Sequence, residues 1–261
     1  MKLAITGKGG VGKTTLTGLL AYAYSAQGRK VLAIDADPSP CLGDALGFSK
    51  ATLHGIKPIA EMEELILERT GAQKGQYGGY FKINPRVDDI PDRFSALYRD
   101  IKLLQLGSVD TGGSGCICPE SVLLKSLVTN ILLSRNEVVL MDMYAGVEHL
   151  GRATADSVDA MLIVAEPTAR SLGTAAQIRD LAGDIKINRL FLVGSKVQGE
   201  DDREFIKKNS PGLPVLGFIS ADPAVRDADR NGLVLYDLAP KLAAEAQEIV
   251  AALDKIILPS S

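Results

Sequence analysis

Residues 7–15 read GKGGVGKTT and follow directly on the apolar run KLAIT of residues 2–6. They fit the pattern G-x-x-x-x-G-K-[ST] of a phosphate-binding loop between a strand and a helix. The matching residues are Gly7, Gly12, Lys13 and Thr14. In such a loop the backbone N–H groups surround the β-phosphate, the lysine reaches the β- and γ-oxygens, and the threonine hydroxyl binds Mg²⁺. A chance glycine-rich turn is the weaker interpretation, because the flanking strand and helix are the context that the motif requires.

The rest of the loop adds further nucleotide-binding candidates and one unexplained cation. Gly9, Gly10, Val11 and Thr15 are expected to supply backbone or hydroxyl groups. Lys8 is not required by the geometry of the loop. A second ammonium beside that of Lys13 would repel it unless the two face different phosphates. We therefore expect Lys8 to reach the nucleotide of a second subunit.

Short apolar runs alternate with helix-like segments along the chain. The runs span residues 2–6, 30–34, 101–106, 138–142, 160–165, 189–193 and 214–219. Nearly continuous apolar runs are typical of parallel strands buried on both faces. Helices are predicted for residues 14–27, before Gly28, for 119–133, which begins with proline, and for 238–253. The alternation predicts an α/β fold, a doubly wound and mostly parallel sheet flanked by helices, with ligands at the carboxyl ends of the strands.

Residues 49–99 interrupt this alternation. They combine the glycine- and tyrosine-rich stretch GQYGGYF with charged, helix-like pieces. We interpret them as an irregular insertion packed on the sheet. Residues 1–261 are accordingly predicted to form a single domain.

Composition argues against several classes of function. The net charge is −3 and the isoelectric point is about 5.5, without a run of five basic residues, so neither nucleic acid nor a membrane surface is an expected partner. No apolar run approaches the ~18 residues that span a bilayer, and the apolar start is too short for a signal peptide. Three cysteines are too few for a secreted disulfide framework, which favours the reducing cytoplasm and free thiols.

The form GKGGVGKT, with its additional lysine, resembles the deviant Walker A ATPases. This family includes the division-site protein MinD, the plasmid-partition ATPases, nitrogenase iron protein and several metallocentre-maturation factors. The resemblance implies Mg²⁺-dependent hydrolysis of ATP to ADP and phosphate, slow for the protein alone. It also implies a face-to-face homodimer with two nucleotides between the subunits. In that arrangement Lys8 contacts the partner's nucleotide, and Lys8 and Lys13 both serve catalysis.

Residues 34–40, IDADPSP, match switch I of this family. The resemblance gives Asp37 the role of orienting the attacking water, and a carboxylate near the γ-phosphate is able to accept a hydrogen bond from that water. A turn or cap residue before Pro38 is the alternative for Asp37. Asp35, at the strand end, is expected to face the Mg²⁺ shell.

Residues 139–146, VLMDMYAG, match switch II. The resemblance implies that Asp142 holds Mg²⁺ through water and that the N–H of Gly146 approaches the γ-phosphate. An ordinary loop carboxylate at a strand end is the weaker alternative for Asp142. Tyr144 stands where the family carries an acidic residue, and its role stays open.

Residues 194–198, GSKVQ, bear on the choice of base. GTP-binding proteins read guanine with N-K-x-D, whereas Ser195 and Gln198 replace the asparagine and the aspartate here. The chain therefore lacks the aspartate that accepts the hydrogen bonds of guanine, and ATP is favoured over GTP. Lys196 remains a candidate contact to the nucleotide. Residues 220–232, SADPAVRDADRNG, resemble the family's adenine loop, with a capped surface helix as an equal alternative. The candidates in this loop are Ala221, Asp222 and Pro223.

Residues 116–120, CICPE, together with 145–152, AGVEHLGR, point to one group within the family. They resemble the CooC group, the ATPases that assist nickel insertion into carbon monoxide dehydrogenase, and relatives in acetyl-CoA synthase maturation. The resemblance runs nearly end to end. It implies an ATP-dependent metallochaperone whose client is carbon monoxide dehydrogenase or a related metalloenzyme.

The chemistry of Cys116 and Cys118 supports a metal site. Both precede Pro119, a helix start whose dipole favours thiolates. One chain offers two thiolates, too few for a closed soft-metal site, whereas two chains offer four. Four thiolates on a twofold axis suit tetrahedral Zn²⁺ or a flattened Ni²⁺ site at the dimer interface. The alternative is a pair of small buried hydrophobic residues at a helix start.

Some residues and two function classes stay open. Cys41 is expected in the core or in switch-loop packing, and His149 is either a half-buried ring or a relay from nucleotide to metal. A positioning ATPase like MinD needs a basic amphipathic tail, which the ending ALDKIILPSS does not provide. An iron–sulfur carrier or electron-transferring reductase is the other alternative.

Overall fold

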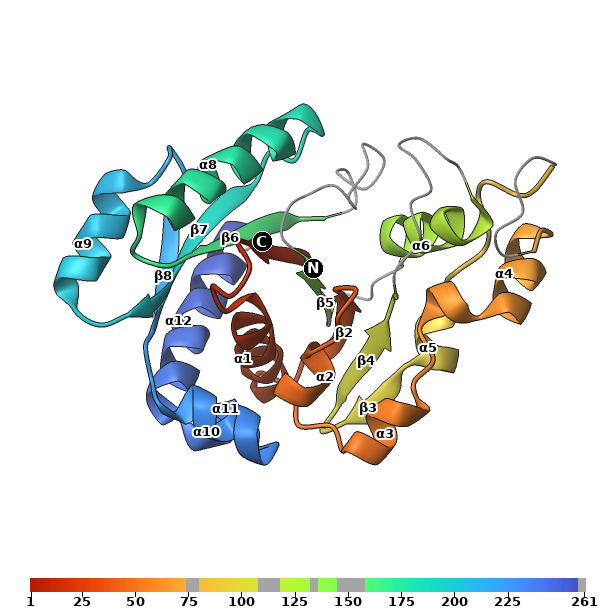
Figure 1. Ribbon diagram of the computed structural model, residues 1–261, viewed down its shortest axis with the longest axis horizontal. Helices are drawn as coiled ribbons and strands as arrows, with labels where there is room; N and C mark the ends of the chain where they lie inside the picture. The colour runs from red at the N-terminus through yellow and green to blue at the C-terminus, as the bar shows by residue number, and fades with distance from the viewer. Residues whose placement is uncertain (74–79, 108–117, 132–135, 145–157, 258–261) are drawn as a thin grey trace.

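The computed structural model describes residues 1–73, 80–107, 118–131, 136–144 and 158–257 (Figure 1). Within them eight strands form one sheet of order β3-β4-β2-β5-β1-β6-β7-β8, in which only β3 and β4 pair antiparallel. The strands are β1 Lys2–Gly7, β2 Lys30–Ala36, β3 Ala96–Tyr98, β4 Ile101–Gln105, β5 Glu137–Met143, β6 Ala160–Ala165, β7 Leu190–Val197 and β8 Val215–Ser220. The predicted fold, a mostly parallel α/β sheet, is confirmed.

Helices cover both faces of this sheet. They are α1 Lys13–Ala26, α2 Leu42–Ala45, α3 Lys50–Gly55, η1 Ile59–Glu61, α4 Glu63–Thr70, α5 Ile90–Phe94, α6 Pro119–Asn130, α8 Ala169–Asp184, α9 Glu200–Asn209, α10 Ala224–Asn231, α11 Leu235–Leu238 and α12 Pro240–Ile257. One hydrophobic core holds α1, α11 and α12, and a second core on the opposite face holds α4, α6 and α8 (Figure 1).

The two cores explain why the strands read as continuous apolar runs. Along β1, Leu3 and Ile5 enter the first core while Ala4 enters the second. Alternate side chains of a strand point to opposite faces, so a strand covered on both sides needs apolar residues at every position. Strand β8 departs from this expectation. It lies at the edge of the sheet, and its residues 215–218 are only half-buried.

The helix boundaries follow local chemistry. Helix α1 ends before Gly28, whose φ of 76° is the left-handed conformation that closes a helix, and α6 begins at Pro119 as predicted. The last helix begins at Pro240, not at residue 238. Proline lacks a backbone N–H and is favoured in the first turn, where that donor has no partner.

Residues 49–99 contain α3, η1, α4, α5 and β3, with residues 74–79 outside the described part. Strand β3 extends the sheet beyond β4, an element that the sequence pattern did not reveal. Ile59, Ile66 and Ile90 pack into the second core. That the whole chain forms one domain stays a prediction. Across the described ranges, no helix combines the length and apolar character needed to cross a membrane.

Candidate functional site

The phosphate loop connects β1 to α1, at the carboxyl edge of the sheet, through glycines in conformations that other residues rarely adopt. Gly7, Gly10 and Gly12 have φ of 149°, 78° and 98°. A side chain on Gly7 would bring a Cβ within 2.4 Å of the Val164 carbonyl oxygen. A Cβ on Gly12 would lie 3.0 Å from Oγ of Ser195. The tight turn and the close approach to neighbouring strands therefore require glycine.

The start of α1 leaves backbone donors available to a ligand. Helix α1 has Gly12 as its N-cap, with no side chain that closes its first turn. The backbone N–H groups of Lys13, Thr14 and Thr15 find no acceptor within the described part of the chain. The Lys13 ammonium, 8% exposed, donates to the carbonyl oxygen of Lys8 at 3.3 Å across the loop. Free N–H groups and a cation together form an anion-binding site.

Two carboxylates lie beside this loop. Asp35 and Asp142 are the penultimate residues of β2 and β5, and the two are paired in register on these adjacent strands. They are 1% and 2% exposed. Burial raises the pKa of Asp35 to about 6 and that of Asp142 to about 7. Hydrogen bonds lower both values in part, from the backbone N–H groups of Leu42 and Asp37 to Asp35 and from the Thr14 side chain to Asp142.

These carboxylates and the Thr14 hydroxyl fit Mg²⁺. Oxygen ligands of this kind are what a hard divalent cation prefers, and a nearby cation would offset the cost of two buried negative charges. The hydroxyl of Thr17 lies 3.5 Å from Oδ1 of Asp142 and donates to the Lys13 carbonyl oxygen at 2.9 Å. Sequence reasoning missed Thr17. Its spacing, one turn after Thr14 on the same face of α1, could have indicated it.

Asp37 lies in a turn just beyond β2. Its carboxylate accepts a hydrogen bond from the backbone N–H of Ser39 at 2.9 Å, and its own N–H donates to Asp35 at 3.2 Å. This is the turn role that the sequence left as an alternative. The carboxylate is half-buried, its second oxygen has no hydrogen-bond partner among the described residues, and its role in orienting water stays a prediction.

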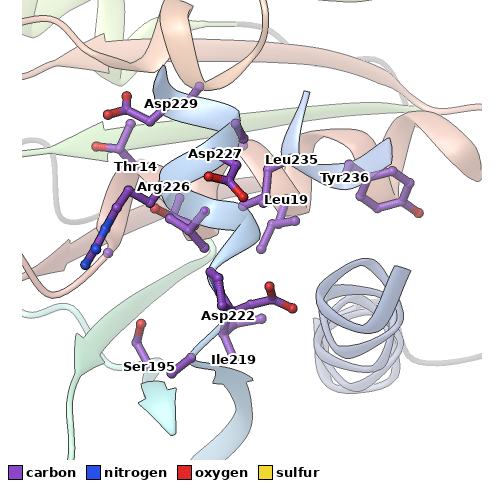
Figure 2. Close-up of a pocket in the computed structure, with 18 of the residues that line it drawn as sticks. Thr14, Leu19, Ser195, Ile219, Asp222, Arg226, Asp227, Asp229, Leu235 and Tyr236 are labelled. Carbon is purple, nitrogen blue, oxygen red and sulfur yellow. The ribbon is translucent and has the colours of Figure 1, made fainter. Parts of the chain in front are cut away.

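A pocket of about 1260 Å³ extends from the phosphate loop along α1 (Figure 2). Thr14 and Leu19 lie on its α1 side, and α10 and α11 form the facing wall with Asp222, Arg226 and Tyr236 among the lining residues. The predicted adenine-loop residues Ala221, Asp222 and Pro223 all line the pocket. Asp222 also accepts a hydrogen bond from the backbone N–H of Ala224 at 2.8 Å and so supports the start of α10. Residues 221–223 thus line the pocket and lead into α10, and their role as an adenine loop stays a prediction.

Lys196 approaches the phosphate loop. It interrupts the pairing of β7 with β8 in a left-handed conformation, with φ of 57°. Its ammonium donates to the Gly10 carbonyl oxygen at 2.6 Å and pairs with Glu166 at 3.4 Å. Lys196 thus braces the loop. The adjacent Ser195 is buried and lines the pocket. Sequence reasoning missed Glu166, although it directly follows β6 at the ligand-binding edge of the sheet.

Of the two predicted metal ligands, only Cys118 falls within the described residues. It is the N-cap of α6 and is 6% exposed. Its backbone N–H donates to Oγ of Ser121 at 3.2 Å, and that hydroxyl donates back to its carbonyl oxygen at 2.9 Å. The helix start is confirmed, and the burial is what the alternative interpretation predicts. Cys116 lies outside the described residues, as do Gly146 and His149.

The remaining cysteines and acidic residues within the described ranges do not form a metal site. The described residues contain no group of three or more His, Cys, Asp or Glu side chains arranged to hold a metal ion. Cys41 is exposed and hydrogen-bonds to the Ser39 carbonyl oxygen at 3.2 Å, so the expectation of a core position was wrong and the switch-loop position holds. Burial and nearby carboxylates raise the pKa of the Cys41 thiol. Tyr144, which directly follows β5, is half-exposed.

The comparison with known proteins matches this geometry. Residues 2–235 match the family model of the CobQ/CobB/MinD/ParA nucleotide binding domain. The chain belongs to this family. It is 46% identical over 260 residues to the carbon monoxide dehydrogenase accessory protein CooC of Rhodospirillum rubrum, covering 100% of this chain and 98% of the relative.

Two further relatives support the assignment. An uncharacterized ATP-binding protein of Methanocaldococcus jannaschii is 45% identical over 252 residues, covering 95% of this chain and 96% of the relative. The MinD cell division protein of Aquifex aeolicus shares the fold, with a TM-score of 0.67 at 21% identity and coverage of 100% and 98%. The predicted enzyme class, a P-loop ATPase that uses ATP and Mg²⁺, agrees with this family and with the open phosphate loop.

Proposed function

We propose that this chain is an accessory ATPase for carbon monoxide dehydrogenase or a related metalloenzyme, which couples ATP hydrolysis to handling of a divalent metal. The observation that carries the proposal is the 46% identity to CooC over essentially the full length of both chains. The phosphate loop, the paired Asp35 and Asp142 and the pocket along α1 supply the nucleotide-dependent part. The metal is the cargo and the metalloenzyme is the client.

The metal would be held by Cys116 and Cys118 of two chains. Each chain offers two thiolates, and a soft divalent ion such as nickel or zinc takes about four ligands. Because the Cys118 side chain is buried at the start of α6, that segment must open for its thiol to reach a shared ion. We propose that ATP binding closes the homodimer and that this closure exposes the Cys118 thiol at the start of α6. A reducing cytoplasm would keep both thiols free.

The homodimer gives Lys8 its function. Its ammonium makes no hydrogen bond or ion pair to any described residue, and the backbone carbonyl of the same residue accepts from Lys13. We assign it to the partner's nucleotide. A Lys8→Ala variant should bind ATP normally but fail to dimerise and to hydrolyse ATP. An unchanged ATP-dependent dimer in sedimentation would contradict the assignment.

Metal stoichiometry tests the whole proposal. Wild-type protein should bind one Zn²⁺ or Ni²⁺ per two chains in a nucleotide-dependent way, measured by metal analysis after gel filtration with ATP, with ADP and without nucleotide. The double variant Cys116→Ala, Cys118→Ala should lose the metal and keep ATP binding. Cys41→Ala, which removes an exposed thiol from the same chain, is the matched control. Wild-type metal affinity in the double variant would rule out the site.

Two alternatives give different outcomes. An iron–sulfur carrier would contain iron and acid-labile sulfide when purified without oxygen, whereas the metallochaperone would contain neither. A positioning ATPase is suggested by the fold shared with MinD. Such a protein would bind membranes or DNA in the ATP state, and we expect binding to neither.

A further inference from the structure

Glu245 lies on α12 and is not among the residues that line the pocket, yet it binds Ser220, the residue at which the pocket wall begins. Its Oε2 accepts a hydrogen bond from the backbone N–H of Ser220 at 2.8 Å, and its Oε1 accepts from the Ser220 hydroxyl at 2.5 Å. Ser220 is the last residue of β8, and the three pocket-lining residues 221–223 follow directly. One carboxylate, 9% exposed, thus accepts hydrogen bonds from both donors of Ser220, its N–H and its hydroxyl.

Close packing of α12 on β8 holds this carboxylate in place. A Cβ on Gly217 would lie 2.6 Å from Cγ1 of Ile249, so the absence of a side chain there lets the helix approach the strand. Ile249 is one turn beyond Glu245 and lies on the same face of α12. Leu242, one turn before Glu245 on this face, is fully buried, as is Ile249. Glu245 is therefore a polar residue placed within an apolar contact.

The negative charge of Glu245 has a cationic partner. Nη2 of Arg203, on α9, lies 3.7 Å from Oε1 of Glu245. The Arg203 guanidinium also lies over the ring of Phe218, 5.0 Å from its centroid, two residues before Ser220. A buried carboxylate needs hydrogen bonds and a counter-charge to offset its desolvation, and this one has both.

The pocket wall is also held by β7, through the residue that follows Ser220. The backbone N–H of Ala221 donates to the carbonyl oxygen of Val197 at 2.9 Å. Val197 follows Lys196, whose ammonium binds the Gly10 carbonyl oxygen of the phosphate loop. Residues 220 and 221 are thus held from two directions, by α12 and by β7, where they enter the pocket wall.

We propose that Glu245 is a positioning residue for nucleoside recognition. Acting through Ser220, it holds residues 220–223 against the space beside Thr14 and Ser195 that the base and ribose would occupy. It touches neither the phosphate loop nor the phosphates. The proposal rests on the nucleotide-dependent function proposed above, and it adds a residue that fixes how well the nucleoside, as distinct from the phosphate chain, is bound.

Separate binding measurements for nucleoside and phosphate test this role. Glu245→Ala should weaken ADP and ATP binding about tenfold, because it leaves the Ser220 N–H and hydroxyl unpaired and releases the wall. Inorganic tripolyphosphate, which lacks the nucleoside, should bind within about twofold of wild type, measured by calorimetry with Mg²⁺. Glu245→Gln should restore ADP binding to within about threefold, because the amide is able both to accept from the Ser220 N–H and to donate to its hydroxyl.

Controls separate this role from general damage. Glu248→Ala, which removes an exposed carboxylate three residues along α12, should leave all three affinities unchanged. Unchanged ADP affinity in Glu245→Ala, or an equal loss of ADP and tripolyphosphate, would overturn the proposal. If Glu245→Ala does not fold, Ser220→Ala takes its place, with an expected loss of about threefold for ADP alone, and unchanged ADP binding would then overturn it. A wild-type protein that binds no ATP would instead refute the proposed function.

Discussion

The starts of α1 and α6 differ in how they treat the unpaired donors of a helix. Helix α1 begins after the left-handed Gly12, and no side chain closes its first turn. Helix α6 begins after Cys118, with Pro119 in its first position and Ser121 bonded to both backbone groups of the N-cap residue. Among the described residues, the first helix start leaves its N–H groups available to a ligand, whereas the second begins with a proline that has no N–H and carries a capping box formed by Cys118 and Ser121.

The contrast shows that the nucleotide site is already formed in the single chain, whereas the start of α6 must change conformation before it can bind a metal. The nucleotide end is preorganised: the glycine turn, Lys13 and the paired Asp35 and Asp142 are in place without a partner. At the start of α6, by contrast, the Cys118 side chain is buried. Metal binding there would require energy from elsewhere, and dimer closure on ATP is the source that the proposed function provides.

The largest effect is expected in hydrolysis, from Asp37→Asn. The amide would still accept the Ser39 N–H bond and keep the turn, but it would lose the charge that orients water. We expect ATP hydrolysis to fall roughly 10²–10⁴-fold with ATP affinity unchanged. Asp201→Ala, on the exposed face of α9, is the control. If Asp37→Asn hydrolyses ATP at the wild-type rate, the turn is the only function of this residue.

Lys13→Ala tests the open end directly. Lys13 is the cation that lies across the loop, and a charge-assisted bond to phosphate would be lost without replacement. ATP and ADP affinity should fall roughly a hundredfold in calorimetry. Lys8→Ala changes a lysine of the same loop and should leave the affinity of the monomer unchanged. Equal losses in both variants would show that the two lysines act on one nucleotide.

Asp142→Asn should stabilise the protein when Mg²⁺ is chelated. Burial raises the pKa of Asp142 to about 7, so the folded state holds a proton that the unfolded chain releases near pH 4. The stability due to this group is complete below pH 4 and is lost as the pH rises through 7. Between pH 5.5 and 7.5, wild type should therefore lose about 2 kcal/mol relative to Asp142→Asn in urea unfolding with EDTA. Excess Mg²⁺ and ADP should reverse the order. A constant difference across this pH range would contradict the assigned pKa.

Most of the fold was predictable from the sequence because its two signals, apolar runs and turn glycines, are local. Continuous apolar runs such as residues 160–165 require cover on both faces, and the glycines of residues 7–12 require a turn that other residues resist. Strand β3 escaped because three residues carry no periodicity, and its pairing with β4 is decided by the neighbouring strand. The edge position of β8 was equally hidden, because strand order depends on the whole sheet.

Site residues that contact the ligand within a motif were predictable from the sequence. Residues that act by holding another residue in place were not. Lys13, Asp35 and Asp142 fall in motifs whose spacing reflects contact with one ligand. Glu166 and Glu245 instead bind Lys196 and Ser220, at separations of 30 and 25 residues that no motif records. Such contacts depend on which strands become neighbours, and they appear only when the sheet has formed.

The smallest effect tests the closed end through Ser121→Ala. The change removes the hydroxyl that accepts the Cys118 N–H and donates to its carbonyl oxygen, and should cost about 1 kcal/mol of unfolding free energy. Thr174→Ala, which removes a hydroxyl bonded within the exposed face of α8, is the matched control for stability. Maleimide labelling mapped by mass spectrometry should show faster reaction of Cys118 in Ser121→Ala, because a loosened N-cap exposes the thiol more often. ADP affinity should stay unchanged, since α1 and α6 lie on opposite faces of the sheet. Unchanged labelling would mean that the core around α6, and not its N-cap, keeps Cys118 buried, and the opening needed for metal binding would then have to move the helix itself.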